Sequence, residues 1–112
     1  MEPCKRGLVS SIGIKDNQDV QYGINHNETH CTGEVGNCGC IHAEADLISK
    51  MTNPDIVIVS HSPCIECAKK LVRAGVKIVY FAILYRKTEG IDFLLENDVK
   101  VILLTENGAV EL

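Results

Sequence analysis

The amino-acid sequence predicts an α/β fold in which short strands and helices alternate along the second half of the chain. Two observations indicate this class. The unbroken β-branched run at 56–59 is typical of a strand covered on both faces, and apolar residues elsewhere recur at helical spacing. Strands that alternate with helices form parallel pairs through right-handed crossovers. Functional side chains are then expected where strand ends meet helix starts.

Each element is predicted from its apolar pattern and from the residues that begin and end it. A polar turn at 16–19 separates the two strands of a predicted β-hairpin, and Asn53-Pro54 ends the first helix. Gly75 ends the second helix. The expected elements are hairpin strands over 8–15 and 20–24, a loop over 25–39 that covers the active site, a helix over 42–51, a strand over 56–59, a helix from 63 to 74, a strand over 76–83, a helix over 89–96 with Ile91, Leu94 and Leu95 inward, and a strand over 99–104.

Length and composition predict a single domain over residues 1–112. No apolar run approaches the roughly 20 residues that a membrane span needs, and the first residues lack a signal-peptide pattern, so a cytoplasmic location is expected. The formal net charge is −4. Proteins that grip a long phosphate backbone usually show a basic face, so a polynucleotide substrate is disfavoured, whereas a mononucleotide needs only one or two cations.

The central feature of the sequence is a pair of short motifs. The first reads His-Ala-Glu at 42–44, and the second reads Pro-Cys-Ile-Glu-Cys at 63–67. A catalytic zinc ion takes three nitrogen or sulfur ligands from the protein and leaves its fourth position to water. His42, Cys64 and Cys67 supply such a set and are therefore predicted to bind zinc.

The second motif is expected to build its part of the site locally. Cys64 and Cys67 stand three residues apart just inside a helix that is predicted to begin at Pro63, with Ser62 as its N-cap. Both sulfurs then project from one face near the amino end of that helix. Free backbone donors and the helix dipole favour the thiolate form there.

Glu44 is predicted to be the catalytic carboxylate. Two residues after His42 it would point away from that ligand on an ideal helix, but a metal at a helix end can be approached from both sides. Zinc lowers the pKa of a bound water to about 7, and a carboxylate within hydrogen-bond reach can take its proton. Glu44 would then pass protons to a ring nitrogen and to a departing amine, which is hydrolytic deamination.

Each motif alone has a simpler interpretation. A Cys-x-x-Cys pair is often a structural zinc site or a redox pair, and His-x-Glu alone indicates almost nothing. Together, with Pro63 before the first cysteine, a helix after each motif and a strand between them, they favour catalysis.

Four further cysteines form a second candidate set. Six cysteines in a cytoplasmic chain argue for metal rather than for disulfides. A structural zinc ion takes four ligands, so a second zinc site is one hypothesis, and a group of buried free thiols is the alternative. The remaining cysteines are Cys4, Cys31, Cys38 and Cys40.

On these motifs the chain resembles the cytidine deaminase superfamily, and within it the deoxycytidylate (dCMP) deaminases. His-x-Glu followed by Pro-Cys-x-x-Cys is the signature of zinc-dependent nucleobase deaminases. The run Ser-Pro-Cys-Ile-Glu-Cys-Ala-Lys at 62–69 is similar to that of the dCMP subgroup. The resemblance implies a three-layer α/β/α sandwich around a five-stranded mixed sheet. It also implies conversion of dCMP to dUMP, a pyrimidine nucleotide as ligand, and a homo-oligomer, and the short chain would suit a phage enzyme.

The resemblance also suggests substrate contacts. Asn25 is expected to contact the sugar hydroxyl and the backbone N–H of Ala43 the pyrimidine carbonyl, whereas Arg86 with Lys87 could neutralise a 5′-phosphate or lie in a solvated loop. The chain reads Gly-Ile-Asn-His at 23–26, where the family often has Gly-Tyr-Asn-Gly. Asn25 is kept, but this departure leaves the nucleotide pose and regulation by dCTP and dTTP open. His26 and His30 could touch substrate or metal, but ordinary polar loop residues are the favoured interpretation. His61 lies near the cysteines and outside the family's ligand pattern, so at most it contacts a metal ligand.

Two rival functions remain open at this point. One is deamination of another base, such as a modified cytosine, guanine or adenosine in tRNA. The other is an inactive, zinc-stabilised module that binds dCMP or dCTP without turnover. The presence of Glu44 argues against the second, because a pure binding module has no need of that carboxylate.

Overall fold

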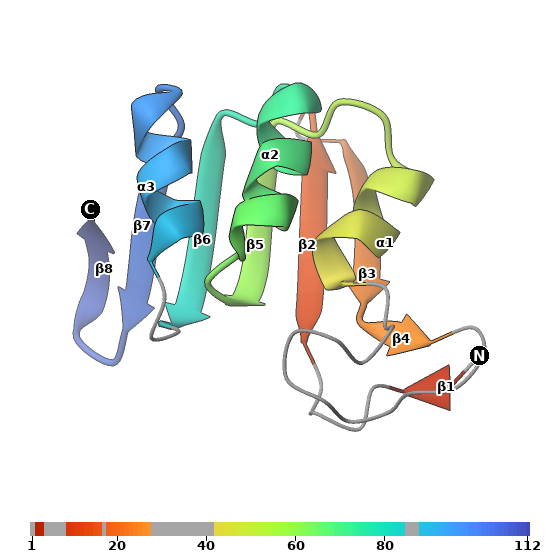
Figure 1. The fold of residues 1–112 in the computed structure, drawn as a ribbon, viewed down its shortest axis with the longest axis horizontal. Coiled ribbons are helices and arrows are strands. Elements are labelled where there is room, and N and C mark those ends of the chain that lie inside the picture. The colour runs from red at the N-terminus through yellow and green to blue at the C-terminus, as the bar shows by residue number, and fades with distance from the viewer. Residues whose placement is uncertain (1, 4–8, 17, 28–41, 85–87) are drawn as a thin grey trace.

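The computed structural model describes residues 2–3, 9–16, 18–27, 42–84 and 88–112 (Figure 1). Three helices lie in these ranges: α1 (Ala43–Lys50), α2 (Ile65–Arg73) and α3 (Glu89–Glu96). The strands are β1 (Glu2–Pro3), β2 (Ser10–Lys15), β3 (Asp19–Ile24), β4 (His26–Asn27), β5 (Ile56–His61), β6 (Ile78–Ile83), β7 (Lys100–Thr105) and β8 (Gly108–Glu111). The predicted hairpin, helices and strands are all found, with ends that differ by a few residues.

The main sheet is mixed and has the strand order β3-β2-β5-β6-β7-β8. Its centre, β5-β6-β7, is parallel, whereas β2 pairs antiparallel with both β3 and β5. Strands β1 and β4 form a separate antiparallel pair. The predicted α/β class with a mixed sheet is therefore confirmed.

The predicted number of five strands is wrong, because β8 adds a sixth to the main sheet. This strand returns antiparallel along β7 after a two-residue turn at 106–107, and Thr105 pairs with Gly108 across it. The Thr105 hydroxyl donates to the carbonyl of Gly108 at 2.7 Å, and Gly108 has a φ of +119°, which glycine adopts without strain. Asn-Gly is a strong hairpin signal that the sequence analysis did not use.

All three helices cover the same face of the main sheet (Figure 1). Two right-handed crossovers, β5-α2-β6 and β6-α3-β7, place α2 and α3 side by side, and α1 lies over β2 and β3 next to α2. The described residues therefore form one helical layer and one sheet, and the second helical layer of the expected sandwich is not among them.

The hydrophobic core lies between the helices and the sheet. Alternate residues of the central strands point into it, and Val57, Val79, Phe81 and Val101 have no exposed surface. Among the inward residues predicted for α3, Ile91 and Leu94 are buried, but Leu95 is 38% exposed, so that part of the prediction is wrong. Leu95 precedes the last residue of an eight-residue helix, where the apolar stripe has turned away from the sheet.

None of the helices in the described ranges has the length and hydropathy that crossing a lipid bilayer requires.

Candidate metal centre

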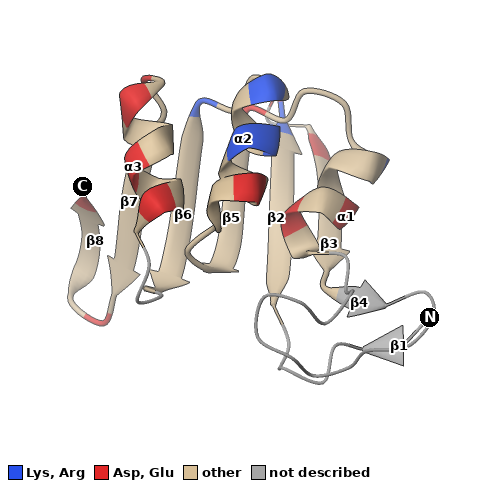
Figure 2. Ribbon diagram, viewed as in Figure 1, with Lys and Arg blue, Asp and Glu red and all other residues tan. Residues whose placement is uncertain are grey.

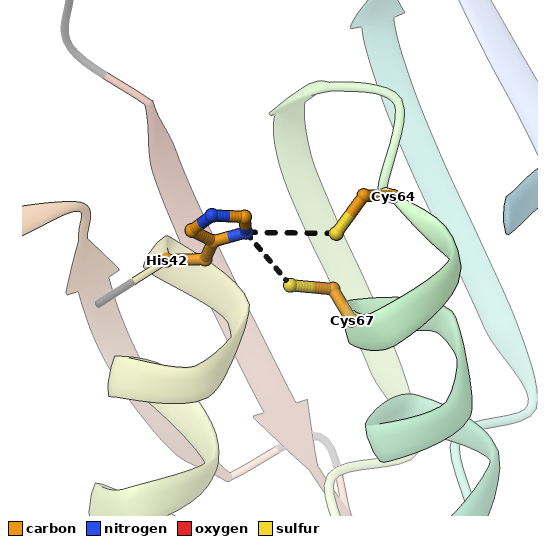
Figure 3. A group of neighbouring side chains, drawn as sticks. All are labelled: His42, Cys64 and Cys67. Atoms are coloured by element: carbon orange, nitrogen blue, oxygen red, sulfur yellow. Dashed lines mark hydrogen bonds between the residues drawn. The ribbon is translucent and has the colours of Figure 1, made fainter. Parts of the chain in front are cut away.

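Figure 3 shows that His42, Cys64 and Cys67 point toward one another between the starts of α1 and α2. The Nδ1 atom of His42 lies 3.3 Å from Sγ of Cys67 and 3.6 Å from Sγ of Cys64. All three ligand atoms lie within 4.8 Å of one another. In the part of the chain that the structure describes, this is the group of side chains that could hold a metal ion.

These distances fit a zinc ion. Zinc binds nitrogen at about 2.0–2.1 Å and sulfur at about 2.3 Å in tetrahedral geometry, which places a nitrogen and a sulfur ligand roughly 3.6 Å apart. The two separations in this chain are close to that value. One imidazole and two thiols also form a donor set of the kind found in catalytic zinc sites, in which a fourth position stays open.

Helix α2 begins later than predicted. Ser62 directly follows β5, and its N–H donates to the carbonyl of Ile83 in β6 at 2.8 Å. Cys64 is the N-cap, with an extended backbone at φ −72° and ψ 169°, and its carbonyl accepts the first helical bond from Ala68. The predicted roles of Ser62 as N-cap and Pro63 as first-turn residue are therefore wrong. The sulfurs converge because an N-cap side chain lies over the third residue of its helix, here Cys67.

Hydrogen bonding between the two thiols moves their pKa values apart. The bond from Cys67, helped by His42 and by the backbone N–H of Cys67, lowers the pKa of Cys64 to about 3 despite partial burial. The same bond and burial raise the pKa of Cys67 well above its ordinary value. Without metal, the hydrogen bond between them therefore favours the thiolate form of Cys64 and the protonated form of Cys67.

Glu44 lies beside this cluster, in the first turn of α1, and is only 4% exposed. Burial raises the pKa of its carboxyl group, and its own backbone N–H opposes that shift. The charges of Cys64 and His42 and the neighbouring side chain of Cys67 also act on the pKa of this carboxyl group. His42 is the N-cap of α1, with an extended backbone at φ −73° and ψ 155°, so the helical angle between positions 42 and 44 does not apply.

Helix α1 is held on the hairpin by polar contacts that the sequence analysis missed. The hydroxyl of Ser11 donates to the carbonyl of Ala43 at 2.8 Å, and the carboxylate of Asp46 accepts the N–H of Ile24 at 3.0 Å. A Cβ on Gly23 would lie 2.4 Å from the carbonyl oxygen of Ala43, so glycine permits this approach. The sequence shows Asp46 in the first turn of this helix. It does not show that Asp46 bonds Ile24, because that contact exists only in the folded protein.

The structure places only some of the other predicted site residues. Asn25 is buried, and its Oδ1 accepts the N–H of Val9 at 2.8 Å, which is a structural contact. Ala43 is buried as the first residue of α1. The Nδ1 of His61 lies 2.8 Å from the hydroxyl of Ser60, and His61 is not part of the metal-ligand group. Several predicted residues lie outside the described ranges: Cys4, Cys31, Cys38, Cys40, His30, Arg86 and Lys87.

Comparison with known proteins identifies the family. The family described as cytidine and deoxycytidylate deaminase zinc-binding region matches residues 1–83, which include both motifs. The chain belongs to this family. Its zinc-binding character agrees with the ligand group at His42, Cys64 and Cys67, which could hold a zinc ion.

Several proteins similar to this member of the deaminase family are known. ComE operon protein 2 of Bacillus subtilis (strain 168) is 30% identical over 98 residues, an alignment that covers 70% of this chain and 50% of that protein. The chain therefore spans half the length of this curated relative. A crystal structure of dCMP deaminase from the cyanophage S-TIM5 in complex with dCMP and dUMP is 33% identical, with a TM-score of 0.76. That match covers 89% of this chain and 83% of the cyanophage chain.

A more distant structure shares the fold alone. The diaminohydroxyphosphoribosylaminopyrimidine deaminase/5-amino-6-(5-phosphoribosylamino)uracil reductase of Thermotoga maritima is 19% identical, with a TM-score of 0.63, and the match covers 85% of this chain and 29% of that one.

Proposed function

We propose that the chain is a zinc-dependent deaminase that converts dCMP to dUMP and ammonia. The observation that carries the proposal is the convergence of His42, Cys64 and Cys67 beside the buried carboxyl group of Glu44. In this assignment His42, Cys64 and Cys67 hold the zinc ion. Glu44 is the catalytic residue. A bound zinc ion would supply Lewis acidity and lower the pKa of a water ligand to about 7.

Glu44 is suited to moving protons in this reaction. In its ionised form it can accept a proton from the attacking water at Oε, and it can then deliver protons to the pyrimidine ring nitrogen and to the departing amine. Burial raises the pKa of its carboxyl group, which makes the protonated form a usable acid nearer neutral pH. The overall balance is one water consumed and one ammonia released for each amino group replaced by a carbonyl oxygen.

The choice of dCMP is supported by the similarity to the cyanophage enzyme, whose structure contains dCMP and dUMP. A 5′-phosphate needs a cation. Figure 2 shows the basic residues of the described ranges toward the C-terminal ends of α1 and α2 and at strand ends away from the metal centre. Arg86, three residues after the end of β6 in the sequence, therefore remains our candidate for the phosphate contact. We assign the sugar contact to Asn25 and the contact with the pyrimidine carbonyl to the N–H of Ala43.

The proposal is tested by incubating the zinc-loaded protein in parallel with dCMP, deoxycytidine, dCTP and guanine and measuring ammonia release. We expect turnover of dCMP at the highest kcat/KM. Faster turnover of another compound would move the assignment to a different deaminase, and a tRNA substrate would in addition show steep salt dependence. Binding of dCMP without ammonia release would indicate an inactive nucleotide-binding module and would refute the proposal.

A homo-oligomer and a single-domain organisation over residues 1–112 remain predictions. Sedimentation analysis of the zinc-loaded protein across a range of concentrations tests the first.

A further inference from the structure

Gly90, in the first turn of α3, packs directly on the main chain that carries Cys64. A Cβ built on Gly90 would lie 2.1 Å from the carbonyl oxygen of Pro63 and 2.8 Å from the carbonyl carbon of Cys64. Real Cβ atoms essentially never approach another heavy atom to less than 3.0 Å. Any side chain at position 90 therefore requires one of the two backbones to move.

Neither backbone has an easy way to move. On the side of the metal centre, the N–H of Ser62 is bonded to the carbonyl of Ile83, and the carbonyl of Cys64 accepts the first helical bond of α2. On the side of α3, Ile91 and Leu94 anchor the helix in the hydrophobic core. A displacement at Gly90 is therefore transmitted to Cys64 rather than absorbed by a flexible side chain.

We infer that Gly90 is a positioning residue for the metal centre: its missing side chain lets α3 press against Pro63 and Cys64 and fixes the Cys64 sulfur opposite His42. The inference rests on the proposed zinc site and adds α3 to the elements that form it. Glycine is a poor helix former, with a penalty of about 1 kcal/mol relative to alanine, so its place inside an eight-residue helix needs a reason. The close backbone approach is that reason.

The test compares Gly90→Ala with Gly75→Ala. Gly75 lies after the C-terminus of α2, has a φ of +83°, and has no atom within 4 Å of a built Cβ. Alanine there strains the backbone without touching the ligand segments, so Gly75→Ala controls for a general loss of stability. Zinc affinity is measured by competition with a chromophoric chelator, and urea unfolding and the cobalt(II)-thiolate absorption bands are recorded for each protein.

We expect Gly90→Ala to weaken zinc binding by about tenfold or more, as changes in the groups that support metal ligands typically do, and to shift the cobalt(II)-thiolate bands. Gly75→Ala should keep wild-type zinc affinity and bands even where its unfolding midpoint falls. Wild-type affinity and bands in a folded Gly90→Ala protein would overturn the inference. Failure of the wild-type protein to bind zinc would instead refute the proposed function, so the two failures are distinct.

A second measurement on the wild-type protein covers the case in which Gly90→Ala does not fold. Coupling between two sites is reciprocal. If zinc affinity depends on the first turn of α3, then bound zinc must in turn stabilise that turn. Hydrogen exchange at the amide of Asp92, which donates to Thr88 at 2.9 Å, should slow on zinc addition more than exchange at Asn97 at the other end of α3. Equal slowing at both ends, or none, would contradict the inference.

Discussion

The Nδ1 atom of His42 and the Sγ atom of Cys67 lie 3.3 Å apart, although 25 residues separate them in the chain. The separation equals, within a few tenths of an ångström, what two ligands of one tetrahedral zinc ion require. The fold therefore brings the ligand atoms together in the protein alone, and zinc would meet a site whose protein ligands already converge.

Replacement of any one ligand should remove tight zinc binding. Loss of an outer partner of a metal ligand weakens binding by about 10- to 100-fold, so we expect His42→Ala or Cys67→Ala to exceed that loss. Zinc content after dialysis and competition with a chelator measure it. His61→Ala is the control, since this histidine is outside the ligand group and should keep wild-type affinity.

The two cysteines of the metal centre should differ in reactivity when metal is removed. The hydrogen bond from Cys67 lowers the pKa of Cys64 to about 3, so Cys64 should be alkylated by iodoacetamide at pH 5–6, where ordinary thiols are protonated. Cys67 is 1% exposed and holds its proton, so it should react slowly. Peptide mass spectrometry separates the two sites, and zinc should protect both. Equal rates at pH 5–6 would contradict the assignment of the proton to Cys67.

The same shift gives the metal-free protein a pH-dependent stability. The folded pKa of Cys64 lies below its ordinary value of 9.0, so ionised Cys64 favours the folded state. This contribution is complete above that value and is lost as the pH falls toward 3. The stability advantage of the wild-type protein over Cys64→Ser in urea unfolding should therefore shrink between pH 8 and pH 4.

Glu44→Gln should separate catalysis from metal binding. Glutamine keeps the size of the side chain but cannot carry the proton, and general acid–base catalysis typically contributes about 10²- to 10⁴-fold. We expect kcat for ammonia release to fall by that factor while zinc content and fold are retained. A Glu44→Gln protein with wild-type activity would exclude Glu44 as the proton carrier.

Asp46 should matter for stability and its ion-pair partner should not. The carboxylate of Asp46 accepts the N–H of Ile24 at 3.0 Å and also lies 3.1 Å from the ammonium group of Lys50, which is 47% exposed. Asp46→Ala leaves a backbone donor without its partner, at a cost of about 1–3 kcal/mol in the free energy of unfolding. Lys50→Ala removes this exposed ion pair and an exposed hydrogen bond to the carbonyl of Tyr22, with a smaller expected cost of about 1 kcal/mol or less. Urea unfolding compares the two, and equal losses would disprove the role given to the Ile24 bond.

Leu47 should be among the side chains on which the fold depends most. Its side chain has no exposed surface. It packs so closely on Gly13 of β2 that a Cβ added to that glycine would lie 3.0 Å from it, and this contact joins α1 to β2. Leu47→Ala should lower the free energy of unfolding by about 2–5 kcal/mol. Leu95→Ala removes a 38% exposed leucine and should have a clearly smaller effect in the same urea experiment.

The three residues of the candidate metal centre could be predicted because two of them lie in one short motif and the third lies in a second motif that begins a helix. Cys64 and Cys67 lie about one helical turn apart, and His42 directly precedes α1. The first residue of α2 could not be predicted, because the hydrogen bond from Ser62 to Ile83 that precedes it joins segments far apart in the chain. The missed strand β8 is different, since Asn107 and Gly108 form a local turn signal that was available.

The groups that support the site were beyond sequence reasoning for a similar reason. Gly23 and Gly90 matter through the backbones they approach, and those contacts exist only once helices and sheet have packed. The layers could not be predicted fully either. The β-branched run at 56–59 predicted a strand covered on both faces, whereas the helices of the described residues all cover one face of the sheet.

The antiparallel pairing of β2 with β5 has a consequence for synthesis on the ribosome. The backbone N–H of Ser10 donates to the hydroxyl of Ser60, fifty residues later in the chain. At roughly 5–20 residues per second the N-terminal hairpin emerges several seconds before the strand that completes its sheet. During that interval His42 leaves the exit tunnel without its two sulfur partners, so the nascent protein can capture zinc in three-ligand form only after α2 has been translated.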